Sequence, residues 1–250
     1  MKKIVLKSMR PLLMVSLLSV FSVMSSCSKD NDDNTTTAEI TEDEAADLVA
    51  TTMAKDSNGM SMTMETSIET AQSNDMFVEA ENSACGQTNT ESYSQANVNG
   101  NYSYNYSLTT SYTLYCTNVG FPDYFTYDAT LTGVYDTPRM SSDDSSELSW
   151  TVTGLPPSND SVVFNGSYER QGTQISKVFN MNTFSSTLTI DLTNVTVNKT
   201  TYMIESGTAT VNFVGTSSSG NQYTYTGSIT FNGDGTANLV INGNAHIINL

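Results

Sequence analysis

The sequence predicts an all-β fold, an antiparallel up-and-down meander of about ten to twelve strands preceded by one short helix. The 250-residue chain is rich in Thr, Ser, Asn and Tyr. Thr and Tyr favour strands, whereas Asn and Gly favour turns. Apolar and polar residues also alternate in long rows from residue 102 onward. A sheet of this size must curl into a barrel or half-barrel, which we prefer, or split into a β-sandwich, to bury one face.

The first 26 residues have the pattern of a cleaved signal peptide. A basic start, Met1 to Arg10, leads into an apolar stretch from Leu12 to Met24. That stretch is shorter than the roughly 20 residues that a helix needs to cross a bilayer. Two serines and Cys27 follow it. Residues 1–26 are therefore expected to be removed from the mature protein.

The residues around Cys27 resemble those of bacterial lipoproteins. Small residues precede the cysteine, which in that family receives acyl chains and becomes the mature N-terminus. The next residues, Ser28-Lys29-Asp30-Asn31-Asp32-Asp33, resemble the Lys-then-acidic tether of Bacteroidetes lipoproteins on the outer face of the outer membrane. The resemblance implies lipidation of Cys27, attachment to the outer membrane through that lipid, and exposure at the cell surface. The alternative is an ordinary secretory signal with an incidental cysteine.

The remaining chain divides into a tether and one domain. Residues 27–40 are polar and acidic and predict a flexible tether. Residues 41–250 are long enough for a single β-rich domain with a sizeable core. The run Thr41-Glu42-Asp43-Glu44 is typical of a capping box, with Ile40 placed to pack on Ala45. We therefore expect a helix over residues 42–56, ended by Asn58-Gly59.

The strand predictions rest on alternation with a period of two. Met60, Met62 and Met64 alternate with polar residues and predict a first strand over residues 60–69. Residues 71–101 lack a clear period and predict irregular structure with one or two short strands. Tyr102 to Cys116 is the longest alternating row. Further strands are expected at 125–135, 148–152, 162–168, 175–179, 188–192, 195–202, 209–213, 223–231, 237–241 and 246–250, with an acidic loop at 141–147 and hairpin turns at 232–235 and 242–244.

The three cysteines divide into one and two. With Cys27 assigned to the lipid, Cys85 and Cys116 remain in an oxidising compartment. They are not spaced as a Cys-x-x-Cys redox motif. We therefore predict a structural disulfide between them.

The net charge and the absence of known catalytic motifs exclude several classes of function from what we expect. The chain has a net charge of −16, and loss of residues 1–26 removes four basic residues and no acidic one, which gives −20. Such a chain repels phosphate, so nucleic acid is not an expected partner. The single histidine, His246, has no nucleophile or metal motif around it, so we expect no enzyme and no cofactor. No metal site is expected either, although the three methionines could offer thioethers to Cu(I) instead of filling the core.

Three non-enzymatic roles remain. The leading prediction is a lipid-anchored protein whose β domain serves binding or structure. The second is a carrier that holds an acyl chain or another apolar ligand in the curled sheet. The third is a glycan-binding module in which exposed tyrosines stack on sugar rings. The candidate stacking residues are Tyr102, Tyr104, Tyr106 and Tyr112.

Overall fold

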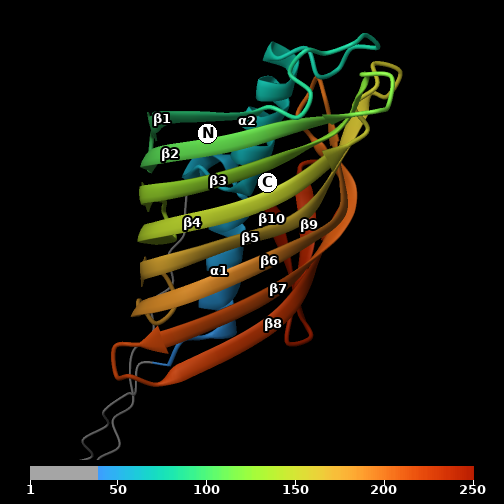
Figure 1. The fold of residues 1–250 in the computed structure, drawn as a ribbon. Helices are drawn as coiled ribbons and strands as arrows, with labels where there is room; N and C mark the ends of the chain where they lie inside the picture. Colours follow the sequence, from blue (N-terminus) through green and yellow to red (C-terminus); the bar gives the residue numbers. More distant parts are fainter. Residues whose placement is uncertain (1–38) are drawn as a thin grey trace, which may run out of the picture. The chain divides into compact units, whose positions relative to one another are not determined.

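The computed structural model describes residues 39–250 as two helices followed by one ten-stranded antiparallel sheet (Figure 1). Strand order in space equals strand order in the chain, so the sheet is an up-and-down meander. It is open, with β1 and β10 at its edges, and it curls around the helices (Figure 1). The predicted all-β meander with an N-terminal helix is confirmed. Residues 1–26, Cys27 and the tether up to residue 38 lie outside the described residues.

Strands β1 to β7 have 12 to 16 residues, β8 has 10, and β9 and β10 have 6 each. Their bounds are β1 (Thr88–Asn99), β2 (Tyr102–Cys116), β3 (Pro122–Asp136), β4 (Met140–Thr153), β5 (Ser161–Ser176), β6 (Thr183–Asn198), β7 (Ile204–Ser217), β8 (Gln222–Phe231), β9 (Thr236–Ile241) and β10 (Asn244–Asn249). The predicted hairpin turn after β9 is confirmed. Asn242 and Gly243 both have positive φ, 46° and 94°, as a tight two-residue turn requires.

The first helix, α1 (Glu42–Met53), begins at the predicted capping box. Thr41 Oγ1 accepts a hydrogen bond from the Glu44 backbone N–H, and the Glu44 carboxylate accepts one from the Thr41 N–H. A 3-10 turn (Lys55–Ser57) follows, and Asn58 ends it with a φ of 53°. The predicted N-terminal helix is thus present, but it ends at Met53 and not at residue 56, because Ala54 has an extended backbone and separates it from the 3-10 turn. No helix within residues 39–250 is long and apolar enough to span a bilayer.

The predicted first strand over residues 60–69 is wrong, because the segment forms the second helix, α2 (Met60–Ser73). Met60, Met64 and Ile68 are buried at helical spacing, whereas Met62 is only half-buried. The alternation of the three methionines matched a strand by coincidence. Met60 and Met64 fill the core together with Met53, which is one of the two roles considered for these methionines above, namely core filling.

The prediction of irregular structure with one or two short strands over residues 71–101 holds for residues 74–87, which form turns and bends, but it is wrong about the length of the strand. The last part of the segment forms β1, a full strand of 12 residues that pairs with β2. Residues on both faces of β1 are polar and mostly exposed, so the sequence carries no hydrophobic period to reveal the strand.

Residues 141–147, predicted as an acidic loop, lie inside β4. Ser142, Asp144 and Ser146 point to the concave side and are buried, although they are polar. In the same way, the segments predicted as strands at 162–168 and 188–192 lie inside β5 and β6, whereas only residues 175–176 of the predicted strand 175–179 belong to β5 and only residues 195–198 of 195–202 belong to β6. Polar residues on the concave face interrupt the hydrophobic rows, and this made single long strands look like short ones.

The core lies between the concave face of the sheet and the two helices. Leu48 and Val49 of α1 and Ile68 of α2 are fully buried against it. The sheet contributes large aromatic side chains, of which Tyr127 stacks on Trp150 and Trp150 meets Phe164 edge to face. The helices therefore occupy the space that an empty half-barrel would leave for a ligand.

Candidate functional site

A row of glycines crosses the sheet at one level. Gly133 of β3 pairs with Asp144 of β4, which pairs with Gly172 of β5, and the row continues through Ser186 of β6 to Gly215 of β7. A Cβ atom at Gly133 would lie 2.1 Å from the Asn105 carbonyl oxygen, and one at Gly172 would lie 2.3 Å from that of Asp143. Only glycine fits such close approaches.

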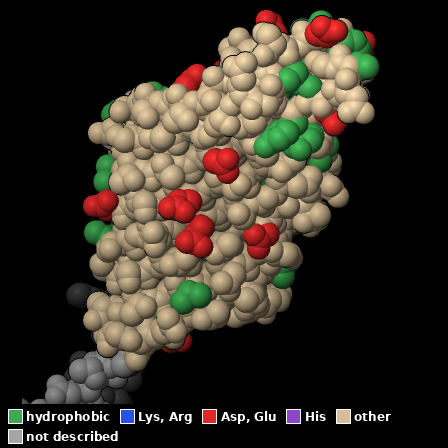
Figure 2. Space-filling model, viewed as in Figure 1, with side chains coloured by type: hydrophobic (Ala, Val, Ile, Leu, Met, Phe, Trp, Pro, Cys, Tyr) green, Lys and Arg blue, Asp and Glu red, His purple; other side chains and the backbone are tan. Residues whose placement is uncertain are grey.

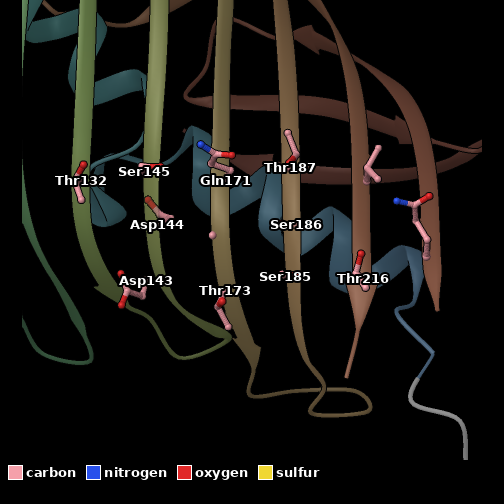
Figure 3. Close-up of a pocket in the computed structure, with 13 residues that line it drawn as sticks. Thr132, Asp143, Asp144, Ser145, Gln171, Thr173, Ser185, Ser186, Thr187 and Thr216 are labelled. Atoms are coloured by element: carbon pink, nitrogen blue, oxygen red, sulfur yellow. The ribbon is translucent and has the colours of Figure 1, made fainter. Parts of the chain in front are cut away.

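A trough of about 640 Å³ lies on the convex face at this level (Figure 3). We call it the polar trough. Its walls are formed by the residues that directly precede or follow the glycine row in each strand. Their side chains therefore point to the opposite face of the sheet. They are mostly hydroxyl and amide groups, and they include Thr132, Asp143, Gln171, Thr173, Ser185 and Thr216.

The trough is open to solvent and lies on paired strands of the sheet. Gln171 and Thr173 are exposed neighbours of Gly172 on β5, and Asp143 is directly opposite Thr173 on β4. Hydroxyl groups donate and accept hydrogen bonds, the amide of Gln171 does both with separate atoms, and the carboxylate of Asp143 accepts. The arrangement can therefore hydrogen-bond a ligand that carries many hydroxyl groups.

The convex face is acidic. In the view of Figure 2, acidic side chains lie across the sheet and no basic one is visible. Glu147 of β4 lies directly opposite Glu169 of β5, and both are exposed. Like charges in such a cross-strand pair repel each other. A second convex-face hollow includes both carboxylates together with Asp128.

All five basic side chains within residues 39–250 are engaged by acceptors. Lys55 pairs with Glu65, Arg139 with Asp47, Arg170 with Asp144, and Lys177 with Asp136. Lys199 donates to the backbone carbonyls of Leu155, Pro156 and Asn159. The described domain thus offers an anionic ligand no basic side chain without an acceptor.

A buried polar network lies under the trough, on the concave side. The Tyr106 hydroxyl donates to Oδ1 of Asp144 over 2.9 Å, and Nη1 of Arg170 donates to Thr52 of α1 over 3.2 Å. Burial raises the pKa of Tyr106. Burial is the largest single effect and lowers the pKa of Arg170, but the Asp144 charge together with Tyr168, Tyr106 and Tyr135 raises it more, so the pKa lies well above its ordinary value. The network ties α1 to the strands that carry the trough.

Sequence reasoning missed both parts of this site. Asp144 was expected in a solvated loop, and Arg170 carries no motif. The usable signal was weak: Gly133, Gly172 and Gly215 each interrupt an alternating row, which indicates a bulge or a close backbone approach.

The predicted tyrosine platform is wrong for two of its four members. Tyr106 and Tyr112 are buried under the helices. Tyr104 is half-buried, and only Tyr102, at the end of β2, is 39% exposed. All four lie on the face of β2 that points toward the helices, and with two of the rings buried they do not form one exposed surface for stacking sugar rings.

The predicted disulfide is present. Cys85 and Cys116 are bonded, with their Cα atoms 5.7 Å apart, and the bond ties the segment before β1 to the end of β2. Glu169, Asp191 and Glu205 lie on exposed positions of their strands. The part of the chain that is described holds no group of three or more His, Cys, Asp or Glu side chains suited to a metal ion.

Comparisons with protein-family models, with curated proteins and with solved structures give no match for this chain.

Proposed function

We propose that this protein is a lipid-anchored outer-membrane protein, exposed at the cell surface, whose β domain binds a neutral oligosaccharide in the polar trough without catalysis. The anchor is supported by the sequence pattern that ends at Cys27 and by the Lys-then-acidic residues after it. The binding role is supported by the geometry of the convex face.

The chemistry of the trough carries this proposal. Its walls present hydroxyl and amide groups on successive strands, with Thr132 on β3, Gln171 on β5 and Ser185 on β6. A sugar chain offers alternating hydroxyl donors and acceptors to such groups. The six wall residues named above include no aromatic ring, so each sugar unit is held by hydrogen bonds alone. Affinity must then come from a chain that spans several strands.

Charge selects the kind of saccharide. Asp143 lies in the trough, and Glu147 and Glu169 are exposed farther along β4 and β5, two of the strands that carry the trough. These carboxylates repel sulfated or uronic-acid polymers and leave neutral chains unaffected. The proposed ligand is therefore an uncharged oligosaccharide.

The carrier alternative has less support. A carrier needs an open apolar cavity on the concave side. In the described domain Leu48, Val49 and Met53 of α1 are fully buried on that side. An acyl chain could enter only if α1 moved away, which would expose these side chains to water.

The test is a binding screen of the full-length, detergent-purified protein against neutral and anionic oligosaccharides. Gln171→Ala combined with Thr173→Val removes two exposed trough groups on β5. The matched control is Thr210→Val, an exposed threonine on β7 outside the trough. We expect neutral chains to bind the wild type and the control, and the double variant to bind them at least several-fold more weakly. Equal binding by all three proteins, or a preference for anionic chains, would refute the proposal.

A further inference from the structure

The β5–β6 loop, residues 177–182, presents two large apolar side chains to solvent at one end of the sheet. Phe179 is 51% exposed and Met181 is 68% exposed. Both residues have positive φ, 53° and 51°, a backbone conformation that bulky side chains rarely adopt. Strained, exposed positions of this kind are found mainly at functional surfaces.

The loop is fixed at both ends. The Lys177 backbone N–H donates to the Arg139 carbonyl oxygen over 2.8 Å, and the Ser176 N–H donates to the Asn182 carbonyl oxygen over 2.9 Å. Asn182 itself is buried and donates through its side chain to Glu44 of α1 over 2.9 Å. The two apolar side chains are therefore held outward by a rigid base.

The chain enters the domain beside this loop. Glu39 is the first described residue, and its carbonyl oxygen accepts a hydrogen bond of 2.6 Å from the Asn182 side chain. Cys27 lies 12 residues earlier in the sequence. A chain of that length spans at most about 40 Å when fully extended. A lipid on Cys27 would thus keep the loop within that distance of the bilayer.

The opposite end of the sheet is much farther away. Strand β5 has 16 residues, which correspond to a length of about 50 Å. Because strands of a meander turn at alternate ends, the β2–β3 turn, residues 117–121, lies at that far end (Figure 1). Val119 in this turn is 63% exposed, nearly as much as Met181.

Charge at the loop differs from charge on the convex face. Arg139 and Lys177 are two of the five basic residues of the described domain, and each pairs with a carboxylate next to the loop, Asp47 and Asp136. These two positive charges offset the two carboxylates with which they pair, while Glu44 lies behind the loop, bonded to Asn182, and Asp43 lies near Arg139. Arg139 also lies over the Phe179 ring, 5.1 Å from its centroid. A neutral apolar tip suits the interface of a bilayer, whereas the acidic convex face does not.

We propose that the β5–β6 loop inserts Phe179 and Met181 into the interface of the bilayer that holds the lipid anchor. This inference rests on the proposed lipid anchor. The end of the sheet that carries the β5–β6 loop then lies against the membrane, and the end with the β2–β3 turn points away from it. The polar trough stays open at the side of the domain.

The test uses the full-length protein reconstituted into phosphatidylcholine vesicles and recovered by flotation. Met181→Cys is labelled with a polarity-sensitive fluorophore, and Val119→Cys serves as the matched control at the far end. The native cysteines do not compete, since Cys85 and Cys116 are bonded to each other and Cys27 would carry lipid. Phosphatidylcholine with a nitroxide on its acyl chain quenches fluorophores that enter the bilayer.

We expect several-fold stronger quenching at position 181 than at position 119, and a clear decrease at 181 when Phe179→Ser is added. Flotation with equal quenching at both positions, or with none at 181, would overturn the loop proposal and leave the anchor intact. Failure of the protein to float would overturn the anchor and the loop proposal together.

Discussion

The guanidinium Nε of Arg170 lies 3.5 Å from Oδ1 of Asp144, and neither side chain is accessible to solvent. The pair joins two neighbouring strands directly under the polar trough, because Asp143, the residue beside Asp144, is part of the trough wall. Arg170 also reaches Thr52 of α1. A buried ion pair therefore fixes the helix layer against the strands whose opposite face forms the candidate binding surface.

Removal of one member of this pair is expected to destabilise the domain strongly. Asp144→Asn leaves the Arg170 guanidinium buried without a counter-charge, which costs about 3 to 5 kcal/mol. Arg170→Met combined with Asp144→Leu removes both charges and is expected to cost much less. Urea unfolding of both variants measures the difference. A loss below about 1 kcal/mol for Asp144→Asn would show that the guanidinium does not depend on this carboxylate.

The glycine row is expected to reject even a methyl group. Gly172→Ala places a Cβ atom against the Asp143 carbonyl oxygen, so the two strands must separate, at a cost of about 1 to 3 kcal/mol. Thr187→Ala, on the convex face of the next strand, is the control and should change the unfolding free energy by about 0.5 kcal/mol or less. Equal effects of the two substitutions would contradict the close approach at Gly172.

The hydrogen bonds of Glu44 at the N-terminus of α1 are expected to contribute more to stability than the negative charge of the first helical turn does. Glu44 is buried and accepts hydrogen bonds from the Thr41 backbone and from the Asn182 side chain. Glu44→Ala should therefore cost about 1 to 3 kcal/mol. Asp43→Ala removes an exposed acid from the same helical turn and should cost only about 0.3 to 1 kcal/mol. Thermal unfolding of both variants decides this, and similar melting temperatures would mean that the contacts of Glu44 contribute little.

Buried tyrosines should make the protein sensitive to alkali. Burial raises the pKa values of Tyr106, Tyr127, Tyr135 and Tyr168 in the folded protein above the ordinary value of 10.0. Above that pH the unfolded chain releases these protons while the folded protein retains them. The stability they contribute is full below pH 10 and is lost as the pH rises toward the folded-state pKa values. Absorbance at the phenolate band and circular dichroism should change together above pH 10. Complete phenolate formation in a protein that stays folded would contradict the burial of these rings.

Local chemistry made some elements predictable. The capping box at Thr41 and Glu44, the turn at Asn242 and Gly243, and the disulfide between Cys85 and Cys116 were all read correctly from the sequence. Each depends on residues whose type fixes a backbone conformation or a covalent bond. The capping box and the turn are also short segments whose residue types alone indicate their conformation.

The wrong predictions concern segments whose local structure is determined by contacts with distant residues. Met60 to Ile68 forms a helix because its buried residues face the sheet, which the alternating methionines concealed. Asp144 could be assigned to a buried strand position only with knowledge of Arg170, 26 positions later. The charge of Arg170 compensates the cost of burying the Asp144 carboxylate. The trough could not be predicted without the register of five strands, because the glycine row beneath it forms only once those strands are paired.

Chemical-shift mapping with a neutral oligosaccharide tests the proposed binding site most directly. In the full-length protein we expect the largest shifts at the amides of Thr132, Gln171, Thr173 and Ser185, with little change in α1. Shifts concentrated at the concave face or at the helices, or no shifts for any neutral chain, would contradict the assignment of the polar trough as the ligand site.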